Sequence, residues 1–106
     1  MKLMTKALAK KMPKLYGTEH IPTEDKVVVA KLFHPASDWT WYIIEYDGND
    51  VCWGLVSGNE KEFGYFSISE LEAIHGPFGL SVERDIFFRP IRVVELAAFN
   101  QGGVVF

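Results

Sequence analysis

Few side chains in this sequence have the types and spacing that catalysis needs. Glu45 and Asp47 lie two positions apart, so in a strand they would share one face and could act as a general acid and a general base. Cys52 or His34 could assist them only if the fold brought either side chain close. Aspartates in turns usually bind local backbone amides instead. A small hydrolase-like enzyme is therefore a secondary interpretation.

Motifs that bind cofactors or metals are absent from the sequence. It contains no phosphate-binding glycine loop, no dinucleotide fingerprint and no nucleophile elbow. The three histidines, His20, His34 and His75, are scattered, and none has a second histidine or a cysteine three or four positions away. We expect no metal site and no cofactor.

Charged residues gather in two segments. The first 14 residues hold five lysines and no acid, and Lys2, Lys6 and Lys10 would share one face of a helix. That face could contact nucleic acid, but the net charge of −3 favours an ordinary solvated face. In the second segment, Glu83-Arg84-Asp85, the arginine could bind an anionic ligand or brace the fold through a carboxylate. We favour bracing.

Two turns allow the register of three strands to be predicted. If Gly48-Asn49 and Gly58-Asn59 are two-residue hairpin loops, Ile44 opposes Trp53, and an aromatic ring lies opposite each of Gly54 and Gly64. One face of the sheet is then an ordinary core. The other face is also apolar, and its aromatic residues are Trp39, Trp41, Phe33, Phe63 and Tyr65. Either helices cover that second face or it binds a partner.

The elements that would position these residues form an α+β fold. An amphipathic helix is predicted over residues 3–12, and strands over 27–33, 39–46, 51–57 and 60–66 would form an antiparallel four-stranded meander. A fifth short strand is read over 86–88. Ser67 and Glu70 form a capping box that starts a second helix, Gly76-Pro77 would end it, and a last helix is predicted over 91–99. We expect the tail, 100–106, to be flexible at its glycines, and its end is apolar.

Size and composition place further limits on the protein. The 106 residues suit a single domain, 1–106, and no apolar run approaches the roughly 20 residues of a membrane span. The single cysteine cannot form an internal disulfide, which is typical of a reducing compartment. We expect a cytoplasmic protein that does not enter a membrane.

Several separated motifs resemble those of one bacterial family, domain of unknown function 2958, over about residues 2–96. They are Lys2-Leu3-Met4-Thr5-Lys6, Trp39-Thr40-Trp41-Tyr42, Gly54-Leu55-Val56-Ser57-Gly58, Gly64-Tyr65-Phe66-Ser67 with Glu70-Leu71, and Gly76-Pro77 with Glu83-Arg84-Asp85. The resemblance implies a small accessory protein, often encoded on plasmids and integrative conjugative elements. It implies no activity and no catalytic residues.

These observations favour a non-enzymatic protein-interaction module. The surface around Trp39 and Trp41 is the expected binding site, for a protein partner or, most simply, for a second copy in a homodimer. The competing interpretation for the two tryptophans is that they pack under the protein's own helices. The alternatives for the whole chain are the small enzyme at Glu45 and Asp47 and weak nucleic-acid binding through the N-terminal lysines.

Overall fold

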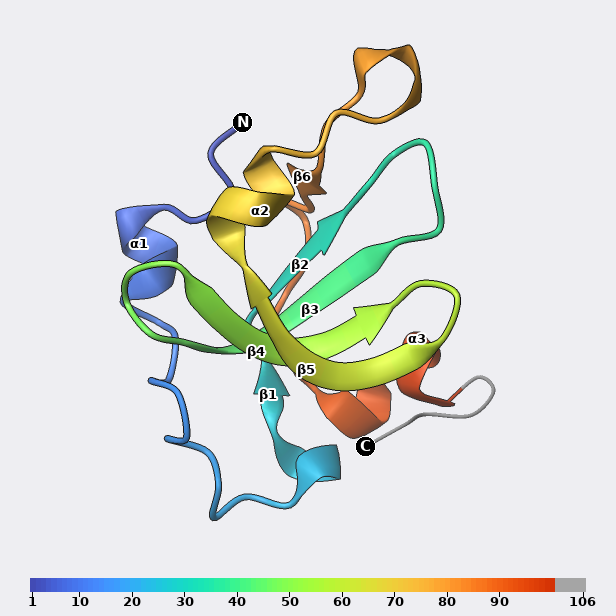
Figure 1. The fold of residues 1–106 in the computed structure, drawn as a ribbon. Helices are drawn as coiled ribbons and strands as arrows, with labels where there is room; N and C mark the ends of the chain where they lie inside the picture. Colours follow the sequence, from blue (N-terminus) through green and yellow to red (C-terminus); the bar gives the residue numbers. More distant parts are fainter. Residues whose placement is uncertain (101–106) are drawn as a thin grey trace.

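A five-stranded antiparallel sheet forms the centre of the computed structural model, which describes residues 1–100, with side chains through Phe99 (Figure 1). Within that range the strand order is β5-β4-β3-β2-β6. The strands are β2 (Ala30–Phe33), β3 (Thr40–Tyr46), β4 (Val51–Ser57), β5 (Lys61–Ser67) and β6 (Glu83–Arg84). Strands β2 to β5 follow one another as a meander. The predicted α+β class and the four-stranded meander are confirmed.

Short helices and a two-stranded sheet complete the fold. The α-helices are α1 (Lys6–Ala9), α2 (Ile68–Glu72) and α3 (Ala97–Asn100), and the 3-10 helices are η1 (Thr23–Asp25), η2 (Pro77–Gly79) and η3 (Val93–Glu95). The small sheet pairs β1 (Val27–Val28) with β7 (Ile91–Arg92). No helix within residues 1–100 has the length and apolar character needed to cross a membrane.

Four predicted elements differ from the structure. The strand predicted over 27–33 divides into β1 and β2, which lie in different sheets. The N-terminal helix covers only 6–9, because Thr5 caps its start by accepting a hydrogen bond from the Leu8 N–H; Leu3 and Met4 lie before the cap and are buried in the core. No strand forms over 86–88, where Asp85 accepts backbone hydrogen bonds from Phe87 and Phe88 and makes a turn; the fifth strand is β6 instead. The predicted helix over 91–99 is a strand, a 3-10 turn and a short helix in succession. The predicted tail, 100–106, lies outside the described residues except for the backbone of Asn100.

The first hairpin has a longer loop than its Gly-Asn pair predicts. Asp47 Oδ1 accepts hydrogen bonds from the backbone N–H groups of Asn49, Asp50 and Val51 at 2.8, 2.7 and 3.0 Å, which holds a wide turn. A bulge then lies between Ile43 and Glu45, so Trp53 pairs with Glu45 and not with Ile44. The predicted register is therefore wrong at this end of β3, although Tyr42 does pair with Leu55.

The second hairpin is also shifted by one residue from the prediction. Ser57 pairs with Lys61, which leaves a three-residue loop, and Gly54 pairs directly with Gly64. The prediction that an aromatic residue opposes each glycine is wrong. A glycine is needed at position 54 because the neighbouring strand is too close for a side chain: a Cβ there would lie 1.8 Å from the carbonyl oxygen of Tyr42. Among the described residues, nothing lies within 4 Å of a Cβ at Gly64.

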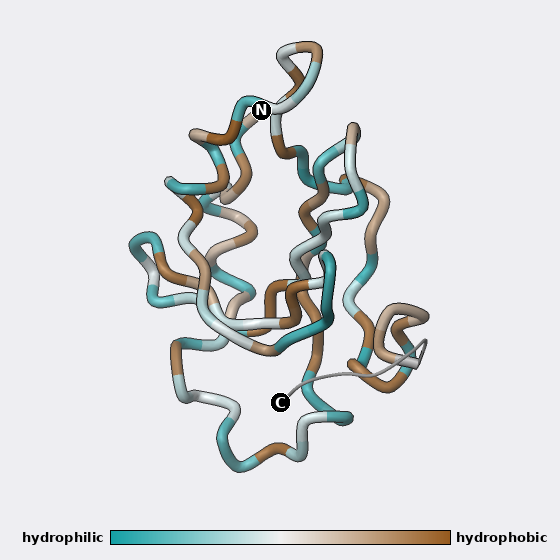
Figure 2. Tube along the Cα trace, turned by 45° about the vertical axis from the view of Figure 1, so that its right-hand side comes forward, coloured by the Kyte–Doolittle hydropathy of each residue, from teal (hydrophilic) through white to brown (hydrophobic). Residues whose placement is uncertain are grey.

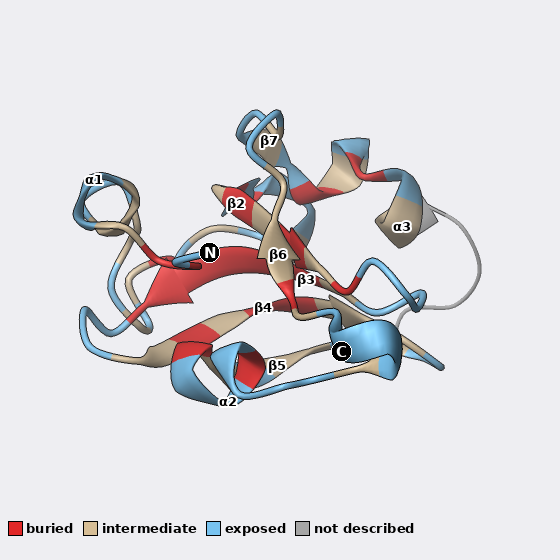
Figure 3. Ribbon diagram, turned by 90° about the horizontal axis from the view of Figure 1, so that it is seen from above, coloured by how far each residue is buried: buried red, intermediate tan, exposed pale blue. Residues whose placement is uncertain are grey.

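Both faces of the sheet are covered by the protein's own segments. On one face the N-terminal segment and α2 cover a core that includes Leu32, Trp41 and Ile43. On the other face, η3 and α3 cover a second core built on Tyr42, Ile44 and Leu55. Figure 3 shows α2 and α3 on opposite sides of the buried strand β3. Surfaces open to a ligand therefore lie at the ends of the sheet and on its loops.

Helix α2 starts at a well-defined cap. Ser67 Oγ accepts a hydrogen bond from the Glu70 N–H at 3.1 Å, as the capping-box pattern predicts. Asp50, from the first hairpin turn, accepts hydrogen bonds from Ser67 Oγ, Ser69 N and Ser69 Oγ. These bonds lower the pKa of Asp50, with the Ser69 hydroxyl making the largest contribution. The cap therefore also ties the hairpin turn to the helix start.

Candidate functional site

An apolar groove lies between the loop that joins β2 to β3 and the segment that follows α2. It has a volume of about 400 Å³. Its lining consists of His34, Ser37, Trp39, Trp41, Ile74, Gly76 and Pro77. The rings of Trp39 and Trp41 stack with their centroids 6.0 Å apart. Trp41 forms the buried floor of the groove at 7% exposure, and Trp39 forms an accessible wall at 40%.

His34 holds the two sides of this groove together. Its buried ring accepts a hydrogen bond from the Ala36 N–H at Nδ1 and donates one from Nε2 to the carbonyl of Leu80, each at 3.2 Å. Gly76 packs against the same ring, since a Cβ there would lie 2.2 Å from His34 Nε2. The predicted helix end at Gly76-Pro77 is wrong, because α2 ends at Glu72, and Gly76, with a φ of −87°, is no left-handed cap. Gly76 instead allows the close approach that shapes the groove.

Phe78 projects from the rim of the groove into solvent. It lies in η2, directly after the groove residue Pro77, and its side chain is 95% exposed. Its φ of 60° and ψ of 20° place a bulky side chain in the left-handed region that favours glycine. In Figure 2 the loop with these residues projects from the top of the molecule and carries apolar segments in brown. An exposed phenylalanine in a strained conformation gives its own fold little stability.

The structure separates the aromatic residues that the sequence placed on one face. Trp39 and Trp41 line the groove, and Trp41 belongs to the core on the α2 side. Phe63 stacks on Trp53 at 5.5 Å and belongs to the core on the α3 side. Phe33 and Tyr65 line two other cavities. The groove thus keeps the two tryptophans and adds Ile74 and Pro77, while Phe78 lies beside it.

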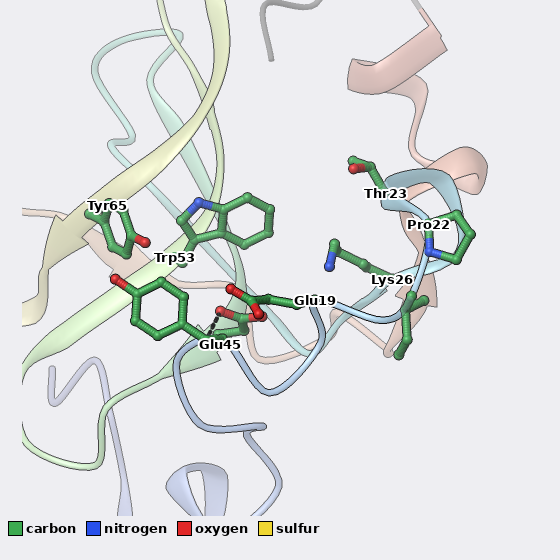
Figure 4. A pocket seen from close by; sticks show the side chains of 9 residues that line it. Glu19, Pro22, Thr23, Lys26, Glu45, Trp53 and Tyr65 are labelled. Carbon is green, nitrogen blue, oxygen red and sulfur yellow. Dashed lines mark hydrogen bonds between the residues drawn. The ribbon is translucent and has the colours of Figure 1, made fainter.

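A second cavity, of about 450 Å³, is polar and lies where the sheet meets the loop after α1 (Figure 4). The sheet supplies Glu45, Trp53 and Tyr65, which are successive neighbours across β3, β4 and β5. The bulge in β3 creates this row, because it moves Glu45 into register with Trp53. The loop and its 3-10 turn supply Tyr16, Glu19, Ile21, Pro22, Thr23 and Lys26.

Buried charges hold the wall of this polar cavity in place. Glu45 accepts hydrogen bonds from the N–H groups of Tyr16 at 2.9 Å and Thr18 at 3.1 Å, and from the Thr18 hydroxyl. Lys26 Nζ donates to the Thr18 carbonyl and, at 3.0 Å, to the Thr18 hydroxyl. All three side chains are buried. The ammonium and the carboxylate are thus joined through Thr18, so their charges balance at short range.

The rim of the polar cavity is aromatic and acidic. Tyr16 and Tyr65 remain 61% and 55% exposed, and their ring centroids are 6.4 Å apart. A hydrogen bond to Tyr16 raises the pKa of Tyr65, and the charges of Glu45 and Glu19 raise it further. Glu19 is exposed, and among residues 1–100 its carboxylate makes no ion pair and no hydrogen bond. Among the charged side chains that line the cavity, Glu19 is therefore the accessible one without a charged partner in the described residues.

The residues predicted for acid–base or thiol chemistry do not assemble. Glu45 is buried with both oxygens accepting hydrogen bonds, whereas Asp47 lies in the exposed hairpin turn, where backbone amides lower its pKa. Burial, with smaller contributions from Asp47 and Asp50, raises the pKa of the Cys52 thiol to about 12, which makes it a poor nucleophile at neutral pH. His34 is engaged at the groove. Across residues 1–100 no cluster of three or more His, Cys, Asp or Glu side chains could hold a metal ion.

The Glu83-Arg84-Asp85 segment has structural contacts in the fold, but Arg84 binds backbone carbonyls and not the predicted carboxylate. Arg84 Nη1 donates to the carbonyls of Lys2 and Leu3 at 2.9 and 3.2 Å, which ties the N-terminal segment to β6. Asp85 lies 3.9 Å from Lys31, and Glu83 pairs with Phe33 in the sheet. The lysines at positions 2, 6 and 10 are all exposed around the four-residue α1.

Sequence reasoning missed most residues of both sites. No sequence motif marked the residues that reach their site through a loop, namely Ile74, Phe78, Thr18, Glu19 and Lys26. One signal was present for the polar cavity: Glu45 interrupts an otherwise apolar strand, and a buried carboxylate requires donors. No comparable signal marked Phe78.

Comparisons with known proteins match the chain to one family. The family model described as "Protein of unknown function (DUF2958)" matches residues 3–103. No curated protein and no solved structure matches the chain.

Proposed function

The chain belongs to the DUF2958 family, and from the groove beside Phe78 we propose that it is a non-enzymatic protein-interaction module whose simplest occupant is a second copy of itself. The single observation that carries this proposal is Phe78, which is almost fully exposed at a positive φ and directly follows the groove residue Pro77. A strained and exposed aromatic side chain costs stability in the monomer. Binding to a partner would offset that cost.

A second copy fits the arrangement because the same surface contains a projecting side chain and a cavity. In a two-fold contact every interaction occurs twice: if one side chain of the first copy enters a cavity of the second, the same side chain of the second copy enters the same cavity of the first. Phe78 of each copy would enter the groove of the other copy, against Trp39 and Ile74. Its own groove does not receive it, as its exposure shows. Burial of a phenylalanine is worth about 1.5–3 kcal/mol, which corresponds to about 10- to 150-fold in affinity.

The mass of the protein in solution tests this proposal. We expect light scattering to show a concentration-dependent rise from 12.0 kDa toward twice that mass. Phe78→Ser should weaken the association by at least about 100-fold, because it removes both equivalent contacts of the two-fold pair. The matched control is Phe87→Ser, because Phe87 is also an exposed phenylalanine but lies outside the groove. A monomer at every concentration, or equal effects of the two variants, would exclude the second copy as occupant.

The biological context is part of the same proposal. The resemblance in the sequence supports an accessory role for a cytoplasmic bacterial protein encoded on mobile elements. Genes adjacent to members of the family test this context. Conjugation or plasmid-maintenance genes should recur beside them, and neighbours of unrelated kinds would contradict it.

A further inference from the structure

We infer that the polar cavity bounded by Tyr16, Tyr65 and Glu19 binds the ammonium group of an organic cation. This site is separate from the apolar groove, and the inference does not depend on the proposed function. The shared chemistry is an alkylated ammonium, carried either by a small molecule or by a methylated lysine side chain of a peptide.

The first argument is the aromatic lining. Trp53, Tyr65 and Tyr16 line one cavity of about 450 Å³, and the two tyrosines keep more than half of their surface exposed. Aromatic faces attract cations through their quadrupole. The cavity already contains one such contact, because Lys26 Nζ lies 5.5 Å from the centroid of the Trp53 ring. The tyrosine side of the cavity offers the same kind of surface to an external ammonium.

The second argument is charge. Lys26 donates to Thr18, and Thr18 donates to Glu45, so this buried chain carries no net charge. Glu19 remains as the unbalanced charge of the cavity, and among the described residues its carboxylate has no bonded partner. The field of Glu45 and Glu19 is among the smaller causes of the raised pKa of Tyr65, after its hydrogen bond with Tyr16 and desolvation. An anion would meet this field unfavourably, whereas a cation would be attracted.

The third argument is position. Figure 4 shows Lys26 on the side of the cavity away from Tyr65, with Trp53 between them in this view. Lys26 is buried and directed at Thr18, so its charge lies in the wall. The glutamate and the two tyrosines form the accessible side. An ammonium that enters from solvent therefore meets Glu19 and the phenol rings before it meets Lys26.

The test uses choline, a peptide with trimethyllysine, and 3,3-dimethylbutanol, which has the shape of choline without its charge. Binding to the whole chain is followed by calorimetry and by NMR shifts of the Trp53 indole and the Tyr65 ring. We expect at least one of the two cations to bind saturably, and the neutral alcohol to bind several-fold more weakly. Choline binding without peptide binding would identify a small-molecule source, and the reverse result a protein source.

Two variants and one control keep the test specific. Glu19→Gln should weaken cation binding by about two- to fivefold, because it removes one exposed opposite charge. Tyr65→Ser should weaken it by about 2- to 30-fold through the loss of one ring. Glu62→Gln is the matched control for Glu19→Gln, since Glu62 is an exposed carboxylate on the strand of Tyr65 but lies outside the cavity. Its binding should equal that of the wild type.

Three results would overturn the inference. One is the absence of saturable binding for both cations at tens of millimolar. Another is equal binding of the neutral alcohol, which would make the cavity merely apolar. The last is an unchanged affinity in both Glu19→Gln and Tyr65→Ser while NMR spectra show that the variants are folded.

Discussion

Phe78→Gly separates the stability of the fold from the function of the groove. Phe78 has a φ of 60° and almost no buried surface, so its replacement loses little packing. A non-glycine residue in the left-handed region costs about 1–2 kcal/mol, and glycine loses about 0.5–1 kcal/mol of backbone entropy on folding. The difference predicts that the monomer of the variant is more stable by about 0.5 kcal/mol.

The matched control is Phe87→Gly, because Phe87 is also exposed but is not among the residues with positive φ. There the glycine relieves no strain, so we expect a loss of about 0.5–1 kcal/mol. The assay is urea denaturation followed by tryptophan fluorescence, at concentrations below and above self-association. At high concentration the wild type should gain stability from association and Phe78→Gly should not.

One result at low concentration would refute this reasoning. If Phe78→Gly destabilises the monomer as much as Phe87→Gly does, then Phe78 contributes packing or the loop is not held at positive φ. Phe78 would then be part of the fold, and its exposure would no longer support a binding role.

Three further predictions test the rest of the structure. Gly54→Ala should cost about 3 kcal/mol or more, because its Cβ would meet the Tyr42 carbonyl, whereas Gly64→Ala should be neutral or up to about 1 kcal/mol stabilising. Equal melting temperatures of the two variants would contradict the close contact at Gly54. The pKa of Asp50 is lowered in the fold, so the stability that its carboxylate contributes is present above the unfolded pKa of about 4 and is lost as pH falls through the lower folded pKa. In urea titrations below about pH 4, Asp50→Asn should therefore lose less stability with falling pH than the wild type does. The Cys52 thiol, with its pKa raised to about 12, should resist a thiol reagent at neutral pH until the protein is unfolded, and rapid reaction of the native protein would show that Cys52 is accessible.

The fold class was predictable because strand composition and turn residues act locally. The β-rich segments, the two hairpins and the Ser67 cap all follow from residues close together in the sequence. The short second-sheet pairing of β1 with β7 was not predictable, since it joins Val28 to Ile91 across most of the chain.

The register prediction fails where side chains alter the turns. The Asp47 carboxylate binds three consecutive amides and widens the first turn, and the bulge before Glu45 then exchanges the faces of the residues beyond it. The Gly-Asn pair alone predicts neither the hydrogen bonds of Asp47 nor the bulge in β3. The polar cavity depends on that bulge, so its wall could not be placed from the sequence.

The candidate binding surface was predictable only at its tryptophans. Trp39 and Trp41 lie two apart in one strand region and do line one groove. Ile74 and Pro77 join them, with Phe78 beside the groove, because His34 binds the loop after α2 through the Leu80 carbonyl. A tertiary contact of that kind has no signature in the local sequence.

Photo-crosslinking from position 78 tests the interaction module most directly. A benzoylphenylalanine in place of Phe78 keeps an aromatic side chain there, and a mixture of isotopically light and heavy protein distinguishes crosslinks between copies from those within one copy. If the module acts as proposed, mixed light–heavy dimers form, and mass spectrometry locates the crosslink in the peptides that carry Trp39 or Ile74. Crosslinks confined to single chains, or mixed dimers joined at peptides outside the groove, would contradict the proposed function.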